Sequence, residues 1–319
     1  TVLLKDLFPG TKSSGPKNLT AIDPTHIFLT AYNSSSQFAS VFVADISAQT
    51  TTGFGHAMVE SLNTETKNLI EYNGLVYFDA MDSNNGNPLW VTNGSEAGTT
   101  KLVDLYPNIS CSDINHMTVF NGSLFFVAST EATGQELFVS DGTTAGTNII
   151  KELASGTVGA YINSSFTKTD TGKMFFGAND NSGIGFELFA TDGSTAGTAL
   201  VKDLNAGSTS SNLSNITAIP GTNKVIFYTS TPYGFWTSNG TSAGTTQISG
   251  LSSISSIGYA PKTISSGSFI SYSEASTYKQ RIYFVNAVTN AATHLNTTYT
   301  TDVVVGSPFL NPTSQTLYY

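Results

Sequence analysis

The stretch that decides the fold is ELFATDGSTAGTALVKDL, residues 187–204. It has an apolar segment, then the pair Asp192-Gly193, then a second apolar segment, which is typical of two strands joined by a tight turn. The sequence contains three close copies: PLWVTNGSEAGTTKLVDL from Pro88, ELFVSDGTTAGTNIIKEL from Glu136 and GFWTSNGTSAGTTQISGL from Gly234.

The turn residue of these copies recurs at a nearly constant spacing. It stands at Asn93, Asp141, Asp192 and Asn239, so the intervals are 48, 51 and 47 residues. Weaker copies, VFVADIS around Asp45 and IYFVNAVTNAAT around Asn286, fit the same period. Self-similarity at a fixed period indicates a repeat architecture.

Each period reads as four short strands. The clearest unit is NLIEYNG, LVYFDAMD, PLWVTNG and TTKLVDL within residues 68–105, with apolar segments bounded by Asn, Gly and Asp. No segment combines a helical period with caps, so we expect little helix. Four-stranded units of this length are typical of propeller blades, and we predict an all-β, seven-bladed β-propeller of antiparallel blades.

The repeat resembles the ELWxTDGTxxGTxLVKDI motif of secreted and surface-attached bacterial β-propeller proteins, sometimes called hyalin-like. The resemblance covers residues 88–105, 136–153, 187–204 and 234–251 well. It implies an extracellular scaffold or binding module and carries no catalytic signature.

The blade count leaves one blade incomplete. We expect a single domain over residues 1–319, with six full blades at about 18–304 and a seventh split between 305–319 and 1–8. The third strand of that seventh blade is missing. Either the chain continues beyond residue 319, or a neighbouring chain inserts a strand by β-augmentation.

Composition excludes several partners. Charged residues make up 11% of the chain, and 13 Lys and Arg face 22 Asp and Glu, for a net charge of −9. Phosphate backbones and anionic lipids are bound by clustered basic residues, so we expect neither nucleic acid nor a membrane surface as partner. No apolar stretch is long enough to span a membrane, so we expect no membrane insertion.

No familiar catalytic or metal-binding motif occurs. The histidines are scattered without metal-type spacing, and Glu136 and Glu187 recur at one repeat position, as blade-building residues do. The loops at 82–87 and 179–183 suggest calcium sites, but both lack the distal Glu of a full calcium loop and are typical of plain turns. We therefore predict no enzyme, no metal site and no cofactor.

Ten Asn-x-Ser/Thr sequons occur in the chain. In a secreted protein, those that fall in turns are the best acceptors for N-glycans. The glycosylation candidates are Asn93, Asn121, Asn239, Asn33, Asn108, Asn18 and Asn212.

The fourth strand of each unit is expected to be an exposed edge. Charged pairs such as Lys202/Asp203 would block unwanted edge pairing there, and three units lack the lysine. Either those units have drifted or their edges face a partner. The interface candidates on these edges are Thr245, Gln247, Ile248, His294, Asn296 and Met58.

Three functions follow from these observations. The first is a non-catalytic extracellular propeller that serves as a structural, assembly or adhesion subunit of a surface filament, layer or matrix, with copies of itself or another surface protein as partner. The second is a carbohydrate-binding, lectin-like propeller that uses Trp90, Trp236, Tyr161 and Tyr233 as stacking platforms. The two tryptophans, however, hold a repeated strand position that favours core packing. The third is a glycoside-active enzyme with its site in the channel.

Overall fold

The computed structural model describes residues 13–21, 24–32, 39–45, 50–53, 68–80, 87–93, 97–106, 114–163, 165–251, 254–274, 280–295, 309–311 and 316–318. The chain divides into two compact units, unit 1 at Thr1–Ala160 and unit 2 at Tyr161–Tyr319. All structural statements below concern the described residues.

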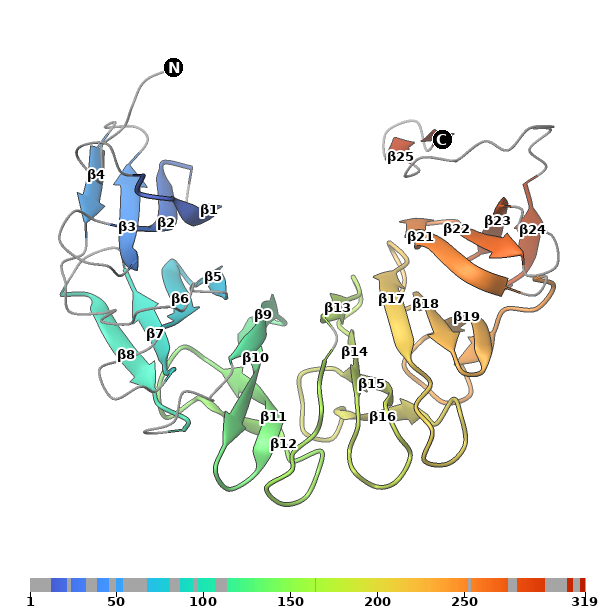
Figure 1. Ribbon diagram of the computed structural model, residues 1–319, viewed down its shortest axis with the longest axis horizontal. Coiled ribbons are helices and arrows are strands. Elements are labelled where there is room, and N and C mark those ends of the chain that lie inside the picture. The colour runs from blue at the N-terminus through green and yellow to red at the C-terminus, as the bar shows by residue number, and fades with distance from the viewer. Residues whose placement is uncertain are drawn as a thin grey trace. The chain divides into compact units, whose positions relative to one another are not determined.

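Unit 1 contains three four-stranded antiparallel sheets, in each of which consecutive strands are hydrogen-bonded neighbours (Figure 1). The first sheet is β1 (Lys17–Ala21), β2 (His26–Tyr32), β3 (Ala39–Asp45) and β4 (Thr50–Gly53). The second is β5 (Leu69–Tyr72), β6 (Leu75–Asp79), β7 (Leu89–Thr92) and β8 (Thr99–Val103). The third is β9 (Asn115–Phe120), β10 (Ser123–Thr130), β11 (Gly134–Ser140) and β12 (Asn148–Lys151).

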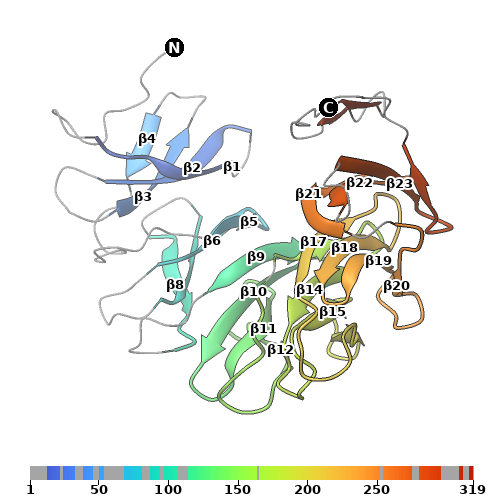
Figure 2. The ribbon, with the colours of Figure 1, turned by 45° about the vertical axis from the view of Figure 1, so that its right-hand side comes forward.

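Unit 2 repeats this organisation, and Figure 2 shows β17, β18 and β19 side by side in its middle sheet. Its first sheet is β13 (Thr167–Lys168), β14 (Met174–Ala178), β15 (Glu187–Thr191) and β16 (Ala199–Lys202). The second is β17 (Leu213–Ala218), β18 (Val225–Ser230), β19 (Tyr233–Ser238) and β20 (Thr246–Gln247). The third is β21 (Ile254–Ile264), β22 (Gly267–Glu274), β23 (Gln280–Asn286) and β24 (Ala292–His294), and a separate two-stranded ladder joins β25 (Phe309–Asn311) to β26 (Thr316–Tyr318).

These sheets confirm the all-β prediction, and the described residues contain no helix. The predicted unit at residues 68–105 forms β5 to β8 as expected. Six four-stranded sheets are consistent with a propeller-like fold. Of the predicted seventh blade, the described residues hold only the β25–β26 ladder, and residues 1–8 lie outside them.

The second strand of the middle sheet of unit 2 is apolar on both faces because a neighbouring sheet covers each face. In β18, Val225 and Phe227 pack into the layer shared with the preceding sheet of unit 2. Ile226 and Tyr228 on the same strand pack toward the following sheet. A strand buried on both faces reads as a continuous apolar run rather than a strict alternation, which is the pattern of the repeated second strands.

The repeated turn is closed by side chains. In unit 2, the Asp192 carboxylate accepts hydrogen bonds from the Ser194 amide (2.9 Å) and hydroxyl (2.7 Å). Behind this turn, the buried hydroxyls of Thr191 and Thr198 lie 2.7 Å apart. A Cβ on Gly197 would lie 2.0 Å from Asp192 Oδ1, so the glycine of the AGT step is required by close approach. The same contacts recur in the copies at Asp141 and Asn239.

Neighbouring sheets within each unit are tied by side chains that donate to backbone carbonyls. In unit 1, the Tyr72 hydroxyl donates to Gly122 O (2.8 Å) and the Thr144 hydroxyl to Leu102 O (2.6 Å). In unit 2, the Thr167 hydroxyl donates to Ile216 O at 2.8 Å. Each tie joins residues about one repeat apart.

Lys202 also forms such a tie. This corrects the expectation that its charge blocks unwanted pairing at an exposed strand edge. Its ammonium donates to Thr245 O at 3.0 Å and lies 5.8 Å from the centre of the Trp236 ring. Both contacts are with the next sheet of unit 2. The lysine therefore joins two sheets instead of shielding a free strand edge.

Gly197→Ala tests the turn through a double-mutant cycle. The added methyl should displace Asp192 from the Ser194 amide and hydroxyl, so we expect Gly197→Ala to lower the free energy of unfolding by about 1–2 kcal/mol. In an Asp192→Ala background those bonds are already absent, and the same substitution should cost less than about 0.5 kcal/mol. Denaturant unfolding measures both values, and additive costs would contradict the described geometry.

Lys202→Met tests the tie between sheets. Loss of the bond to Thr245 O and of the cation–π contact should lower the free energy of unfolding by about 1–2 kcal/mol. Lys262→Met in β21 is the matched control, because it removes the same charge from the same unit. Equal effects of the two substitutions on the melting temperature would exclude a specific tie.

Candidate substrate-binding edge of unit 2

The candidate site lies where the second and third strands of neighbouring sheets are joined in unit 2. This edge contains the hairpin at 179–186, the connection at 203–212 and the hairpin at 231–232. We call Tyr161, Phe186, Ser211 and Tyr233 the tyrosine edge. The two tyrosines are large exposed side chains, 61% and 64% exposed.

Tyr161 is held in place by the hairpin that follows β14. Its amide donates to Asn179 O at 3.1 Å, and the Asn179 amide donates back to Tyr161 O at 3.2 Å. Its ring meets Phe186 edge-on with centroids 6.5 Å apart. The backbone is thus fixed by a two-bond ladder, while the ring stays open to solvent.

Ser211 connects this hairpin to the one that carries Tyr233. Its hydroxyl and its amide both donate to Phe186 O at 3.1 Å, and its own carbonyl accepts the amides of Ser230 (3.2 Å) and Thr231 (3.3 Å). Tyr233 follows two residues later, and its carbonyl accepts a bond from Gln247 Nε2 at 2.7 Å.

The sequence prediction named Tyr161 and Tyr233 but missed Phe186 and Ser211. One signal for Phe186 was available in the sequence. It is an aromatic residue just before the repeated Glu187, at a position where the preceding copy has Gln135.

Glu136 and Glu187 each hold the connection that leaves their sheet. Both carboxylates are fully buried. Glu136 accepts the amides of Leu153 (2.9 Å) and Ala154 (3.1 Å) in unit 1. Glu187 accepts the amides of Leu204 and Ser211, both at 3.0 Å, in unit 2. These contacts agree with the expectation that the repeated acids build the sheets.

Burial makes these two carboxyl groups unusually weak acids. Desolvation raises the pKa of Glu136 and of Glu187 to about 7, against the opposing effect of the amides that bind their charged forms. The negative charges of Glu152 and Asp203 add to the increase. Each carboxyl therefore changes charge near neutral pH.

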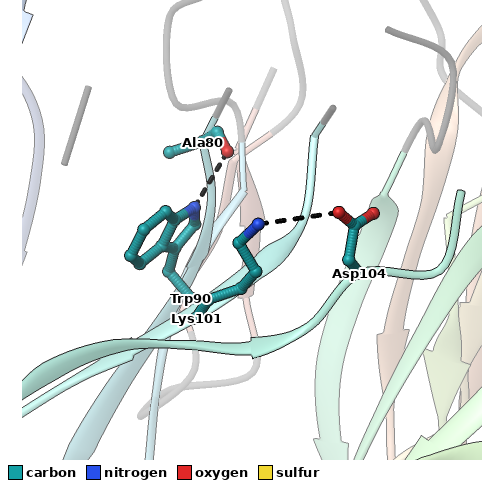
Figure 3. A network of polar contacts seen from close by, with 4 residues as sticks. All are labelled: Ala80, Trp90, Lys101 and Asp104. Atoms are coloured by element: carbon teal, nitrogen blue, oxygen red, sulfur yellow. Dashed lines mark hydrogen bonds and ion pairs between the residues drawn. The ribbon is translucent and has the colours of Figure 1, made fainter. Parts of the chain in front are cut away.

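Both tryptophans are core residues. Trp90 is 9% and Trp236 7% exposed. Trp90 Nε1 donates to Ala80 O at 2.9 Å, next to the 3.6 Å ion pair of Lys101 and Asp104 (Figure 3). Trp236 Nε1 donates to the Thr229 hydroxyl at 2.9 Å. Neither ring is open as a stacking platform.

The structure corrects two of the interface candidates. Thr245 is fully buried and its hydroxyl donates to Thr241 O, while Ile248 is 5% exposed within the apolar layer between two sheets. Gln247 is exposed, and the half-buried His294 packs its ring against Tyr283. Met58 and Asn296 lie outside the described residues.

The glycosylation candidates differ in their surroundings. Asn93, Asn121 and Asn212 are exposed; the last two adopt positive φ, Asn121 in a turn and Asn212 just before β17. Asn239 is half-buried, with its side-chain oxygen bonded to Thr241 as Asp192 is to Ser194. Two candidates, Asn33 and Asn108, lie outside the described residues, and Asn18 lies in β1. Glycan occupancy and an extracellular location stay predictions.

Two kinds of feature are absent from the described ranges. No cluster of three or more His, Cys, Asp or Glu side chains there could hold a metal ion. None of the described segments forms a helix of the length and apolar character needed to cross a membrane.

Glu136→Gln and Glu187→Gln should reduce the pH dependence of stability. Because the folded-state pKa of each carboxyl is raised from 4.5 to about 7, its contribution is fully present below pH 4.5 and is lost as pH rises to about 7. The loss is on the order of 3 kcal/mol per group. Each variant should lose less stability than the parent between pH 5 and 7.5 in denaturant unfolding.

Other titrating groups contribute equally to the pH dependence of stability in each variant and in the parent, so their effects cancel in the comparison. Burial lowers the pKa of His116, which acts in the opposite direction, since neutral His116 stabilises the fold as pH rises. The pKa values of Asp141 and Asp192 are lowered by their turn hydroxyls, so their contribution changes only in more acidic solution. Identical pH profiles for variants and parent would contradict the titration of Glu136 and Glu187.

Several solved structures are similar to this chain at low sequence identity. A prolyl endopeptidase matches with a TM-score of 0.51 and 6% identity, over 90% of this chain and 43% of its own. A puromycin hydrolase mutant matches with a TM-score of 0.47 and 10% identity, over 91% and 47%. An oligogalacturonate lyase from Vibrio parahaemolyticus matches with a TM-score of 0.44 and 11% identity, over 96% and 86%. No family model and no curated protein matches the chain.

The match to the prolyl endopeptidase overturns the expectation of a non-catalytic structural, assembly or adhesion subunit and of no enzyme. That expectation treated the repeat architecture as one without catalysis, and the solved chain that matches with a TM-score of 0.51 is a prolyl endopeptidase. The chain spans less than half the length of the first two solved chains. At these identities the likeness establishes the fold alone.

Proposed function

We propose that this chain is the propeller-like portion of a peptide hydrolase and that its tyrosine edge binds the peptide substrate. The observation that carries the proposal is the likeness to the prolyl endopeptidase, with a TM-score of 0.51 over 90% of this chain. That structure was studied for the role of inter-domain dynamics in catalysis and specificity.

The geometry of the edge supports peptide binding. Tyr161 and Tyr233 expose most of their rings while their backbones are fixed by hydrogen bonds. Exposed aromatic rings on a rigid backbone bind extended, proline-containing segments, because the proline ring packs on an aromatic face and the extended form loses little entropy. The tyrosine hydroxyls supply hydrogen bonds to peptide carbonyls.

Tyr161→Ala and Tyr233→Ala test this function. Each should weaken binding of a fluorescein-labelled, proline-containing peptide by about 5–10-fold, because each removes an aromatic anchor. Fluorescence anisotropy of the 319-residue chain measures the dissociation constant.

Val288→Ala is the matched control. Val288 is 85% exposed in the turn after β23, which lies at the opposite end of the sheet from the hairpins of the tyrosine edge. We expect it to bind like the parent. No saturable peptide binding, or tyrosine variants that bind like the parent, would overturn the proposal.

A further inference from the structure

Glu187 combines complete burial with a central position in the tyrosine edge. Its Oε2 accepts the Leu204 amide and its Oε1 the Ser211 amide, so one carboxylate holds both ends of the 204–211 loop. Ser211 in turn binds Phe186 O and accepts two amides from the Tyr233 hairpin. Displacement of this loop would therefore disturb the supports of both exposed tyrosines.

The charges around Glu187 disfavour its ionised form. Its partners in the loop, Leu204 and Ser211, are uncharged, and the charged neighbour that acts on it is Asp203, just after β16. The nearby ammonium of Lys202 is directed to Thr245 O and the Trp236 ring in the next sheet. A buried carboxylate beside a second carboxylate is stabilised when water reaches it.

The next sheet of unit 2 supplies an internal comparison. At the position of Glu187 it has Gly234, and a Cβ there would lie 2.3 Å from Gln247 Nε2. The connection leaving that sheet spans residues 248–253, shorter than the connection 203–212 held by Glu187. Of these two sheets of unit 2, the one with the longer connection carries the buried acid, whereas in unit 1 the long connection 104–114 follows a sheet with Pro88 at this position.

We propose that Glu187 is a proton-operated latch on the 204–211 loop, which stays closed when the carboxyl is protonated and opens when it ionises. The inference rests on the proposed function, since it describes the regulation of the same tyrosine edge. On ionisation the proton passes to solvent, and opening of the loop lets water hydrate the carboxylate. The hydrogen bonds to Leu204 and Ser211 are exchanged for bonds to water.

Linkage sets the pH range of this opening. The closed loop raises the pKa of Glu187 to about 7 from the 4.5 expected of a hydrated carboxyl. The closing equilibrium constant therefore falls by up to about tenfold per pH unit between these values and levels off above pH 7. Peptide affinity at the tyrosine edge should decrease over the same range.

Amide hydrogen exchange on the full chain tests the latch directly. Protection factors of the Leu204 and Ser211 amides should fall by up to about tenfold per pH unit between pH 5 and 7 in the parent. In Glu187→Gln they should be independent of pH. Glu136→Gln is the matched control, because it alters the equivalent carboxyl of unit 1 and should leave the Leu204 and Ser211 amides titrating as in the parent.

Asp203→Asn provides a second variant that keeps the carboxyl of Glu187. Removal of the neighbouring negative charge should move the midpoint of the protection change to lower pH. An unmoved midpoint, or the same pH dependence in Glu187→Gln as in the parent, would overturn the latch.

Peptide anisotropy on the same samples separates the two proposals. Tyrosine-dependent binding that weakens from pH 5 to 7 in the parent but not in Glu187→Gln supports both. Tyrosine-dependent binding without a titrating loop overturns the latch alone. A titrating loop with no peptide binding at any pH overturns the proposed function and leaves the latch in place.

Discussion

The hydrogen bonds from a hydroxyl residue to the Asp or Asn two positions earlier are the contacts on which the repeated sheets depend. They close the turn between the third and fourth strands at Asp141, Asp192 and Asn239. The closed turn brings together a buried pair of hydroxyls, such as Thr191 and Thr198, which satisfies two polar groups inside the sheet. The motif TDGSTAGT, residues 191–198, therefore encodes a turn, a close approach and an internal polar contact in eight residues.

Much of the fold could be predicted from the sequence because the turn chemistry is local. Strands β5 to β8 follow the predicted unit, and the predicted blade-building role of Glu187 matches its contacts with Leu204 and Ser211. The exposure of fourth-strand residues could not be predicted. Thr245 and Ile248 were assigned to an exposed edge, yet the sheets of unit 2 bury both, because hydroxyl pairing and packing between sheets do not appear in a strand pattern.

The candidate site was only partly accessible to sequence reasoning for a related reason. Tyr161 and Tyr233 could be named as aromatic residues near the junctions between units, and both are exposed. The bonds that connect their hairpins pass through the backbone of Phe186 and Ser211, which no motif identifies. Function was predicted wrongly because low charge and the lack of a catalytic motif describe the surface and the local sequence, whereas catalytic groups are assembled from distant segments.

The ties between sheets end on main-chain carbonyls, as in Tyr72 to Gly122 O, Thr144 to Leu102 O and Thr167 to Ile216 O. A carbonyl is present whatever side chain the accepting residue carries. A sheet can therefore accept a neighbour of different sequence without a matching change of its own. Duplication, loss or exchange of whole units in evolution would leave these junctions intact, and each unit would be free to acquire its own surface.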